Sequence, residues 1–169
     1  YAPPASVHSS SRGGALCLES ASTIISQTLL ATNRAFGGAA PNTLENVLVP
    51  SAAYGGAILA KSGTLNLLHC SVFSNLAIGG NGFRHSGTGE AEGGALYSSA
   101  SLLVKDTAFS GNRAQSGNGS SKNTSGAGGA VHNSGSAVFE RCAFVANSVE
   151  GGASGSFGSP DAYWQAGHG

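Results

Sequence analysis

The chain has 169 residues, of which 27 are glycine, and its eight lysines and arginines balance eight aspartates and glutamates. This neutral charge provides no electrostatic footprint for nucleic acid or for an anionic membrane surface. The apolar runs of three to five residues are far shorter than the roughly 20 residues that span a bilayer, so we expect no nucleic-acid partner and no membrane insertion in this segment.

Residues 1–12 ("YAPPASVHSSSR") predict a loop or linker, because Pro and Ser predominate there. The chain begins with Tyr1 instead of Met, which indicates a processed chain or a segment of a longer one. The Ser-rich part is also compatible with O-glycosylation.

Four copies of one unit follow, and we place them at residues 13–54, 55–92, 93–127 and 128–152. Each copy opens with Gly-Gly-Ala, in "GGALC", "GGAIL", "GGALY" and "GGAVH", and reaches an asparagine 19 or 20 residues later. These asparagines are Asn33, Asn75, Asn112 and Asn147. The distance from an asparagine to the next glycine pair varies, at 22, 18 and 16 residues, which indicates rigid units joined by loops.

Apolar residues recur at fixed distances from each asparagine, with variable and often polar positions between them. The column eight positions earlier holds Ile25, Leu67, Val104 and Phe139; the column three positions earlier holds Leu30, Val72, Phe109 and Phe144; the column two positions later holds Ala35, Ala77, Ala114 and Val149. This alternation predicts about three short strands in each unit. Because such a unit buries its apolar face only by stacking on a copy of itself, we predict an all-β fold, a right-handed parallel β-helix of about four rungs with variable Gly/Ser-rich loops.

Stacking gives the asparagine column a specific expected role. Side-chain amides repeated along a stack of parallel strands form a ladder, which makes buried asparagine tolerable. A second column, five positions before each asparagine, holds the small residues Thr28, Cys70, Thr107 and Cys142. Cys70 and Cys142 would lie two rungs apart, about 9.6 Å from each other, which is too far for a disulfide. We interpret them as small buried apolar residues.

The pairing of Gly-Gly-Ala-Ile/Leu/Val with Phe-x-x-Asn resembles the repeat of the polymorphic outer membrane protein family of autotransported surface proteins. The second half of the motif reads "LATN", "VFSN", "FSGN" and "FVAN" here, so Leu30 and Val72 replace the family's phenylalanine in the first two units. The resemblance covers about residues 13–152. It implies a right-handed β-helix in a surface-displayed and commonly adhesive passenger, and it implies no catalytic residue.

If a β-helix of this kind is an enzyme, the class that the fold suggests is a polysaccharide lyase or hydrolase. These chemistries need clustered carboxylates, whereas this chain has two aspartates, Asp106 and Asp161, and its glutamates are dispersed. Glu90 and Glu92 lie close together in a Gly-rich stretch that we interpret as a solvated loop. We therefore predict no enzyme and no catalytic residue, with a polysaccharide-binding or pectate-lyase-like polysaccharide-degrading β-helix as the alternative.

Metal and cofactor sites are not expected either. His132 shares a variable column with Cys17, Leu59 and Tyr97, which we expect to point outward, so it is interpreted as a surface histidine. "GGNGFRHSG" starts like a calcium-binding nonapeptide, but Arg84 stands where that motif needs Asp. The three cysteines show no CxxC spacing that would indicate zinc.

The remaining expectations concern surfaces and partners. An outward column of Ile24, Leu103 and Val138, together with Trp164, is the candidate contact surface. Asn118-Gly-Ser and Asn123-Thr-Ser are candidate glycosylation sites. Residues 153–169 predict a Gly-rich loop or linker that continues into further rungs or the next subunit. Because bare strand edges template further pairing, we expect end-to-end self-association or a host or cell-surface ligand such as a glycan, in an extracellular or surface-displayed adhesin or filament.

Overall fold

The structure of the protein is a computed structural model, and it describes residues 10–39, 50–82, 87–119 and 126–153. Within these ranges every regular element is a β-strand, and every strand pairing is parallel. No helix in these ranges is long and apolar enough to span a membrane. The expected all-β, parallel and solenoid-like architecture is therefore confirmed.

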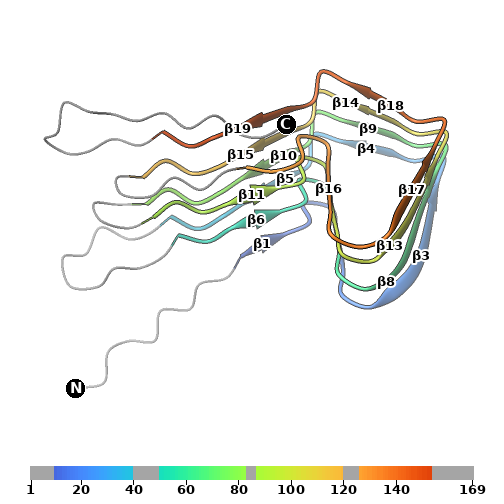
Figure 1. Cartoon of the computed structure of the whole chain (residues 1–169), viewed down its shortest axis with the longest axis horizontal. Helices are drawn as coiled ribbons and strands as arrows, with labels where there is room; N and C mark the ends of the chain where they lie inside the picture. Colours follow the sequence, from blue (N-terminus) through green and yellow to red (C-terminus); the bar gives the residue numbers. More distant parts are fainter. Residues whose placement is uncertain (1–9, 40–49, 83–86, 120–125, 154–169) are drawn as a thin grey trace, which may run out of the picture.

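Three of the five sheets enclose a region that we call the body, drawn as three sides of a wedge in Figure 1. The first sheet contains β2 (Leu16–Leu18), β7 (Ile58–Ala60), β12 (Leu96–Ser98) and β16 (Val131–Asn133). The second contains β3 (Ala21–Ser26), β8 (Gly63–Leu68), β13 (Ser101–Lys105) and β17 (Ala137–Glu140). The third contains β4 (Leu29–Ala31), β9 (Ser71–Phe73), β14 (Ala108–Ser110) and β18 (Ala143–Val145).

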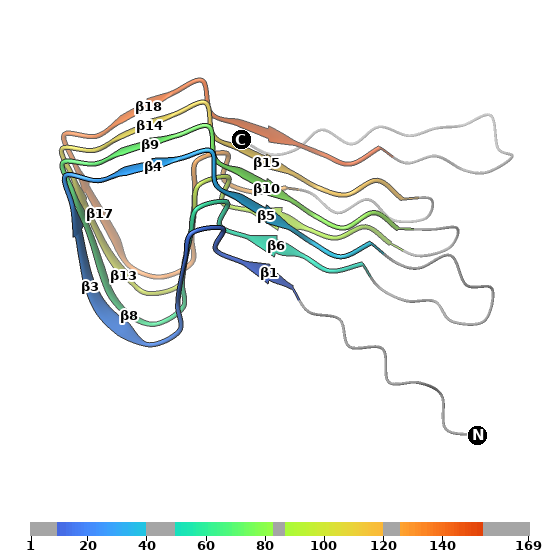
Figure 2. The same ribbon diagram turned by 180° about the vertical axis from the view of Figure 1, so that it is seen from behind.

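The other two sheets lie face to face and form a region that we call the arm, which extends sideways from the body in Figures 1 and 2. One layer contains β1 (Ser11–Arg12), β6 (Ala53–Tyr54) and β11 (Ala91–Glu92). The other contains β5 (Arg34–Phe36), β10 (Leu76–Ile78), β15 (Arg113–Gln115) and β19 (Ser148–Glu150). The arm corrects two expectations, because the connections between units begin and end as paired strands, and β1 lies within the predicted linker 1–12.

Left-handed backbone conformations form the corners of the solenoid. The first glycine of each unit, at Gly13, Gly55, Gly93 and Gly128, has φ between 57 and 69°, a region that glycine enters without steric cost. Two further corners use residues other than glycine at φ of 49–57°, exemplified by His69 and Ser74, except that Gly111 occupies the Ser74 position in the third unit. The side chain after the His69 corner donates back across it, from Cys70 Sγ to the Leu68 carbonyl at 3.3 Å.

This corner explains the column of small residues. Thr28, Thr107 and Cys142 each donate to the carbonyl two residues earlier, like Cys70. A left-handed corner costs an ordinary residue roughly 1–2 kcal/mol, and a local side-chain hydrogen bond offsets part of that cost. The cysteines therefore act as donors as well as small apolar residues, and all three cysteines of the chain are free thiols.

The core of the body consists of large apolar side chains. Its fully buried members include Ile58, Leu67, Leu96, Val104 and Phe109. The columns read from the sequence coincide with the pairing register, because Leu30, Val72, Phe109 and Phe144 are successive partners across β4, β9, β14 and β18. Burying one side chain of this size contributes roughly 1.5–3 kcal/mol.

The core of the arm consists of alanine. Ala35, Ala53, Ala77, Ala91 and Ala114 are almost completely buried between its two layers. Methyl groups this small let the layers approach so closely that backbone hydrogen bonds connect them beyond the strand ends. Four such hydrogen bonds follow one another along the stack, with N···O distances of 2.8–3.0 Å: Ser51 N–H to Gly38 O, Gly80 N–H to Ser51 O, Gly89 N–H to Gly80 O, and Gly117 N–H to Gly89 O.

The last described unit departs from the expectation that its phenylalanines fill the interior. Phe144 stacks on Phe109 at a centroid distance of 5.0 Å, and Phe139 meets Phe144 edge-on. Phe139 and Phe144 nevertheless remain 41% and 49% exposed. The physical reason is positional, because within the described ranges no further strands stack on β17 and β18.

Candidate functional site

The four asparagines lie in one column where the body meets the arm, a place that we call the waist. Each Oδ1 of Asn75, Asn112 and Asn147 accepts two hydrogen bonds from the asparagine of the preceding unit, one from its backbone N–H and one from its Nδ2, at 2.9–3.0 Å. Each Nδ2 also donates to a carbonyl of the preceding unit, as Asn112 does to Val72. These bonds satisfy amides whose burial would otherwise be costly.

The waist also explains why Gly-Gly-Ala and asparagine occur together. The second glycine of each unit passes directly against the backbone of the residue that follows the asparagine. A Cβ at Gly56 would lie 2.6 Å from Leu76 N, and a Cβ at Gly94 would lie 2.6 Å from Arg113 N. No side chain fits there. The glycine pair and the asparagine therefore occur together because the chain segments that contain them pass against each other at this point.

The candidate surface and modification residues are dispersed over other parts of the molecule. Ile24, Leu103 and Val138 share one outward column of the sheet of β3, β8, β13 and β17, in which Asn66 separates Ile24 from Leu103. Asn118 is exposed, and its Oδ1 accepts from the Ala153 backbone N–H. Asn123 and Trp164 lie outside the described residues.

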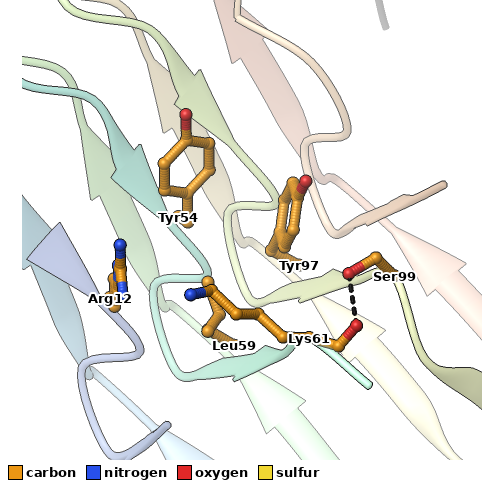
Figure 3. Close-up of a pocket in the computed structure, with 6 residues that line it drawn as sticks. All are labelled: Arg12, Tyr54, Leu59, Lys61, Tyr97 and Ser99. Atoms are coloured by element: carbon orange, nitrogen blue, oxygen red, sulfur yellow. Dashed lines mark hydrogen bonds between the residues drawn. The ribbon is translucent and has the colours of Figure 1, made fainter. Parts of the chain in front are cut away.

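A groove lies in the angle between the arm and the body, and Figure 3 shows its lining. It has a volume of about 360 Å³ and is lined by Arg12, Tyr54, Leu59, Lys61, Tyr97 and Ser99. Arg12 and Tyr54 come from β1 and β6 of the arm, whereas Leu59 and Tyr97 come from β7 and β12 of the body. The strand register places these residues in two facing columns, Arg12–Tyr54–Glu92 on the arm and Cys17–Leu59–Tyr97–His132 on the body.

Aromatic rings follow the groove along the stacking direction. The ring of Tyr54 lies 5.0 Å from that of Tyr97, with the two planes tilted by 60°. The ring of His132 stacks on the other side of Tyr97 at 5.3 Å, nearly parallel to it. Aromatic pairs at such distances contribute roughly 0.5–1.5 kcal/mol beyond their buried area. The three rings therefore form a continuous aromatic surface across successive units.

Charged side chains flank this surface at both ends. Glu19 accepts from Arg12 at 3.0 Å and from Lys61 at 2.7 Å, and the hydrogen bond from Lys61 lowers the pKa of the Glu19 carboxyl. At the other end, Glu92 Oε2 lies 3.9 Å from His132 Nε2. Burial raises the pKa of Glu92, an effect that His132 opposes and Glu90 reinforces. Burial, followed by the charge of Glu92, also raises the pKa of the Tyr54 hydroxyl.

Two sequence-based interpretations are corrected here. The column of His132 faces the groove instead of open solvent, and its member Leu59 is only 1% exposed because the arm covers that face of the body. Glu92 is part of strand β11 and is half-buried, so it does not belong to a solvated loop. Tyr54 and Tyr97 were not expected as site residues. The signal that identifies Tyr54 is positional, since Arg12, Tyr54 and Glu92 each directly precede a glycine pair, whereas Tyr97 is marked only by its column with Leu59 and His132.

Other constellations in the described ranges are ion pairs on outer surfaces. Arg141 binds both oxygens of Asp106, which lowers the pKa of that carboxyl, and Lys105 pairs with Glu140 at 3.0 Å. Arg113 pairs with Glu150 in the outer layer of the arm. No group of three or more His, Cys, Asp or Glu side chains in the described ranges is arranged to hold a metal ion.

Comparison of the chain with protein-family models, with curated proteins and with solved structures finds no match.

Proposed function

We propose that this chain is a non-enzymatic structural and adhesive segment of an extracellular protein, displayed on a surface or assembled into fibres. In this proposal its parallel sheets form a right-handed β-helix. The hand rests on the general behaviour of crossover connections between parallel strands, which are right-handed in about 98% of cases.

The observation that carries the proposal is the contrast between inner and outer units within one column. Phe109 is fully buried, whereas Phe144 in the same column is 49% exposed. At the opposite face, Leu16 is 36% exposed, whereas its partner Ile58 is 1% exposed. Each outer unit thus presents the apolar columns that an inner unit buries against a neighbour. A further unit, from the same solenoid or from another copy of the chain, is the surface that matches these columns.

The distribution of carboxylates supports a structural rather than a catalytic role. Asp106, Glu19, Glu140 and Glu150 each pair with a lysine or arginine on an outer surface or at the edge of the groove. General acid–base chemistry needs carboxyl groups that face a common reacting atom, and these four carboxylates lie on separate columns.

Electron microscopy and sedimentation of the isolated chain test the self-association. We expect uniform fibres or concentration-dependent oligomers from the unaltered chain. Phe144→Asp places a charge on the exposed face of the last described unit and should abolish assembly. Phe73→Asp is the matched control, because Phe73 lies on an inner strand, β9, and is likewise partly exposed, at 36% against 49% for Phe144.

Assembly that survives Phe144→Asp, or assembly lost equally in both variants, would contradict stacking through these apolar columns. Short monomeric rods at every concentration would overturn the fibre-forming part of the proposal. Circular dichroism of each variant separates a loss of assembly from a loss of fold.

A further inference from the structure

We propose that the groove between arm and body binds a glycan chain whose sugar rings carry carboxylate groups. The groove is a different surface from the unit faces proposed to mediate stacking. Glycan binding and self-association can therefore be tested independently.

The aromatic rings supply the first part of the recognition. Tyr54 and Tyr97 line the groove together, and each presents an apolar ring with a polar hydroxyl at its end (Figure 3). Aromatic side chains of this kind offer a flat apolar surface next to a hydrogen-bonding group. The face of a sugar ring has the same character, with C–H groups on the face and hydroxyls at the edge. Leu59, which is 1% exposed, lies at the floor of the groove with these rings.

The charges supply the second part. The charged groups that line the groove are Arg12 and Lys61, and both share the single carboxylate of Glu19. One positive charge therefore remains uncompensated within this trio. The side chains of Arg12 and Lys61 are partly exposed, so they reach a ligand without rearrangement of the backbone. A guanidinium binds a carboxylate through two parallel hydrogen bonds, which favours carboxylate-bearing sugars over neutral ones.

The arrangement along the stacking axis favours a chain over a single small molecule. Tyr54, Tyr97 and His132 lie at three successive levels of the stack, because β6 leads directly into β7, and β7, β12 and β16 are neighbours in one sheet. Parallel strand spacing separates these levels by about 4.8 Å each. The aromatic surface therefore extends along the direction in which the solenoid grows. A linear glycan lying in this direction contacts the cations at one end and the Glu92–His132 pair, which can accept and donate hydroxyl hydrogen bonds, at the other.

Single-stranded nucleic acid also combines rings with negative charge, but the groove fits it less well. Binding to phosphate backbones depends on neutralising several phosphates with lysine or arginine. This groove offers one uncompensated cation, and Glu19 and Glu92 border it. A glycan chain needs only one of its carboxylates at this cation, because its hydroxyl groups supply its other hydrogen bonds to the groove.

Isothermal titration calorimetry of the full chain with a hexamer of α-1,4-linked galacturonic acid tests the proposal. We expect saturable binding, with the corresponding neutral glucose hexamer at least about tenfold weaker. Tyr97→Ala should weaken galacturonate binding about tenfold, because it removes the ring that lines the groove between Tyr54 and His132, while Tyr97→Phe keeps the ring and should retain most of the binding. Lys61→Gln should weaken it about fivefold or more.

Lys105→Gln provides the matched control. Lys61 and Lys105 have nearly equal side-chain exposure, at 39% and 40%, and each pairs with one glutamate, but Lys105 lies outside the groove. Lys105→Gln should change the affinity less than twofold. Absence of galacturonate binding, equal binding of the neutral hexamer, or equal effects of Lys61→Gln and Lys105→Gln would each overturn the proposal. Tighter binding of a thymidine hexanucleotide would overturn it in favour of nucleic acid.

Discussion

The body and the arm are built from the same four units, yet they are held together by different forces. In the body, Ile58, Leu96 and Phe109 fill the space between three sheets. In the arm, the buried apolar cluster between the two layers consists of alanine methyl groups, and backbone hydrogen bonds such as Gly80 N–H to Ser51 O connect the layers directly. Large buried apolar side chains stabilise the body. The arm is instead stabilised by the close approach of its two layers, which only small side chains permit. The two regions should therefore respond in opposite ways to changes in side-chain size.

The largest effect is expected from loss of volume in the body. Phe109→Ala removes a fully buried ring that stacks on Phe144, and we expect the free energy of unfolding to fall by about 3–5 kcal/mol. Ala77→Gly removes a methyl group from the arm and should cost no more than about 1 kcal/mol. Urea denaturation of both variants measures the difference. Similar losses would show that the two cores do not differ in kind.

Adding side-chain volume should have the opposite result and destabilise the arm more than the body. A Cβ at Gly80 would lie 2.0 Å from the carbonyl oxygen of Gly38, so Gly80→Ala must separate the layers and should cost about 3 kcal/mol. Gly38→Ala is the control, because its Cβ would only touch the Ser51 hydroxyl at 3.6 Å. That variant should be neutral or slightly more stable, since alanine restricts the unfolded chain. Equal melting temperatures of the two variants would refute the close approach of the layers.

The waist, which joins the two regions, should show a smaller effect that depends on position. Asn112→Leu removes the acceptor of two hydrogen bonds from Asn75 and should lower the free energy of unfolding by at least about 1 kcal/mol. The Asn33 side chain makes one ladder bond, to Asn75, so Asn33→Leu should cost less. Thermal unfolding monitored by circular dichroism compares them, and an unchanged melting temperature in Asn112→Leu would exclude a stabilising ladder.

The sequence columns predicted the body well because the spacing within each unit is nearly constant. From the first glycine to the asparagine the chain has only 19 or 20 steps to trace its corners, so equivalent residues return to equivalent positions. Val72, for example, pairs with Leu30 on one side and Phe109 on the other, as the column requires. The role of Cys70 was only partly foreseen, because the left-handed corner that its thiol bridges is a property of the backbone.

The arm and the groove were not foreseen because the connections between units differ in length and are rich in Gly, Ser and Ala. When residues are counted forward from each asparagine, equivalent positions no longer align after a few residues, and the paired strands before the glycines then look like loop. When residues are counted backward from the glycine pair, equivalent positions stay aligned. On that count Arg12, Tyr54 and Glu92 are equivalent, but their shared position does not reveal that they face Leu59 and Tyr97.

The sequence by itself therefore determined the all-β class, the unit length and the residues that stack within each column, because these follow from a period that repeats along the chain. Only the tertiary structure decided that the connections pair into a two-layer arm, and that this arm covers one face of the body. Such contacts join columns that have no fixed spacing between them. Their geometry depends on how closely two backbones approach, which alanine and glycine permit here and which no periodic pattern encodes.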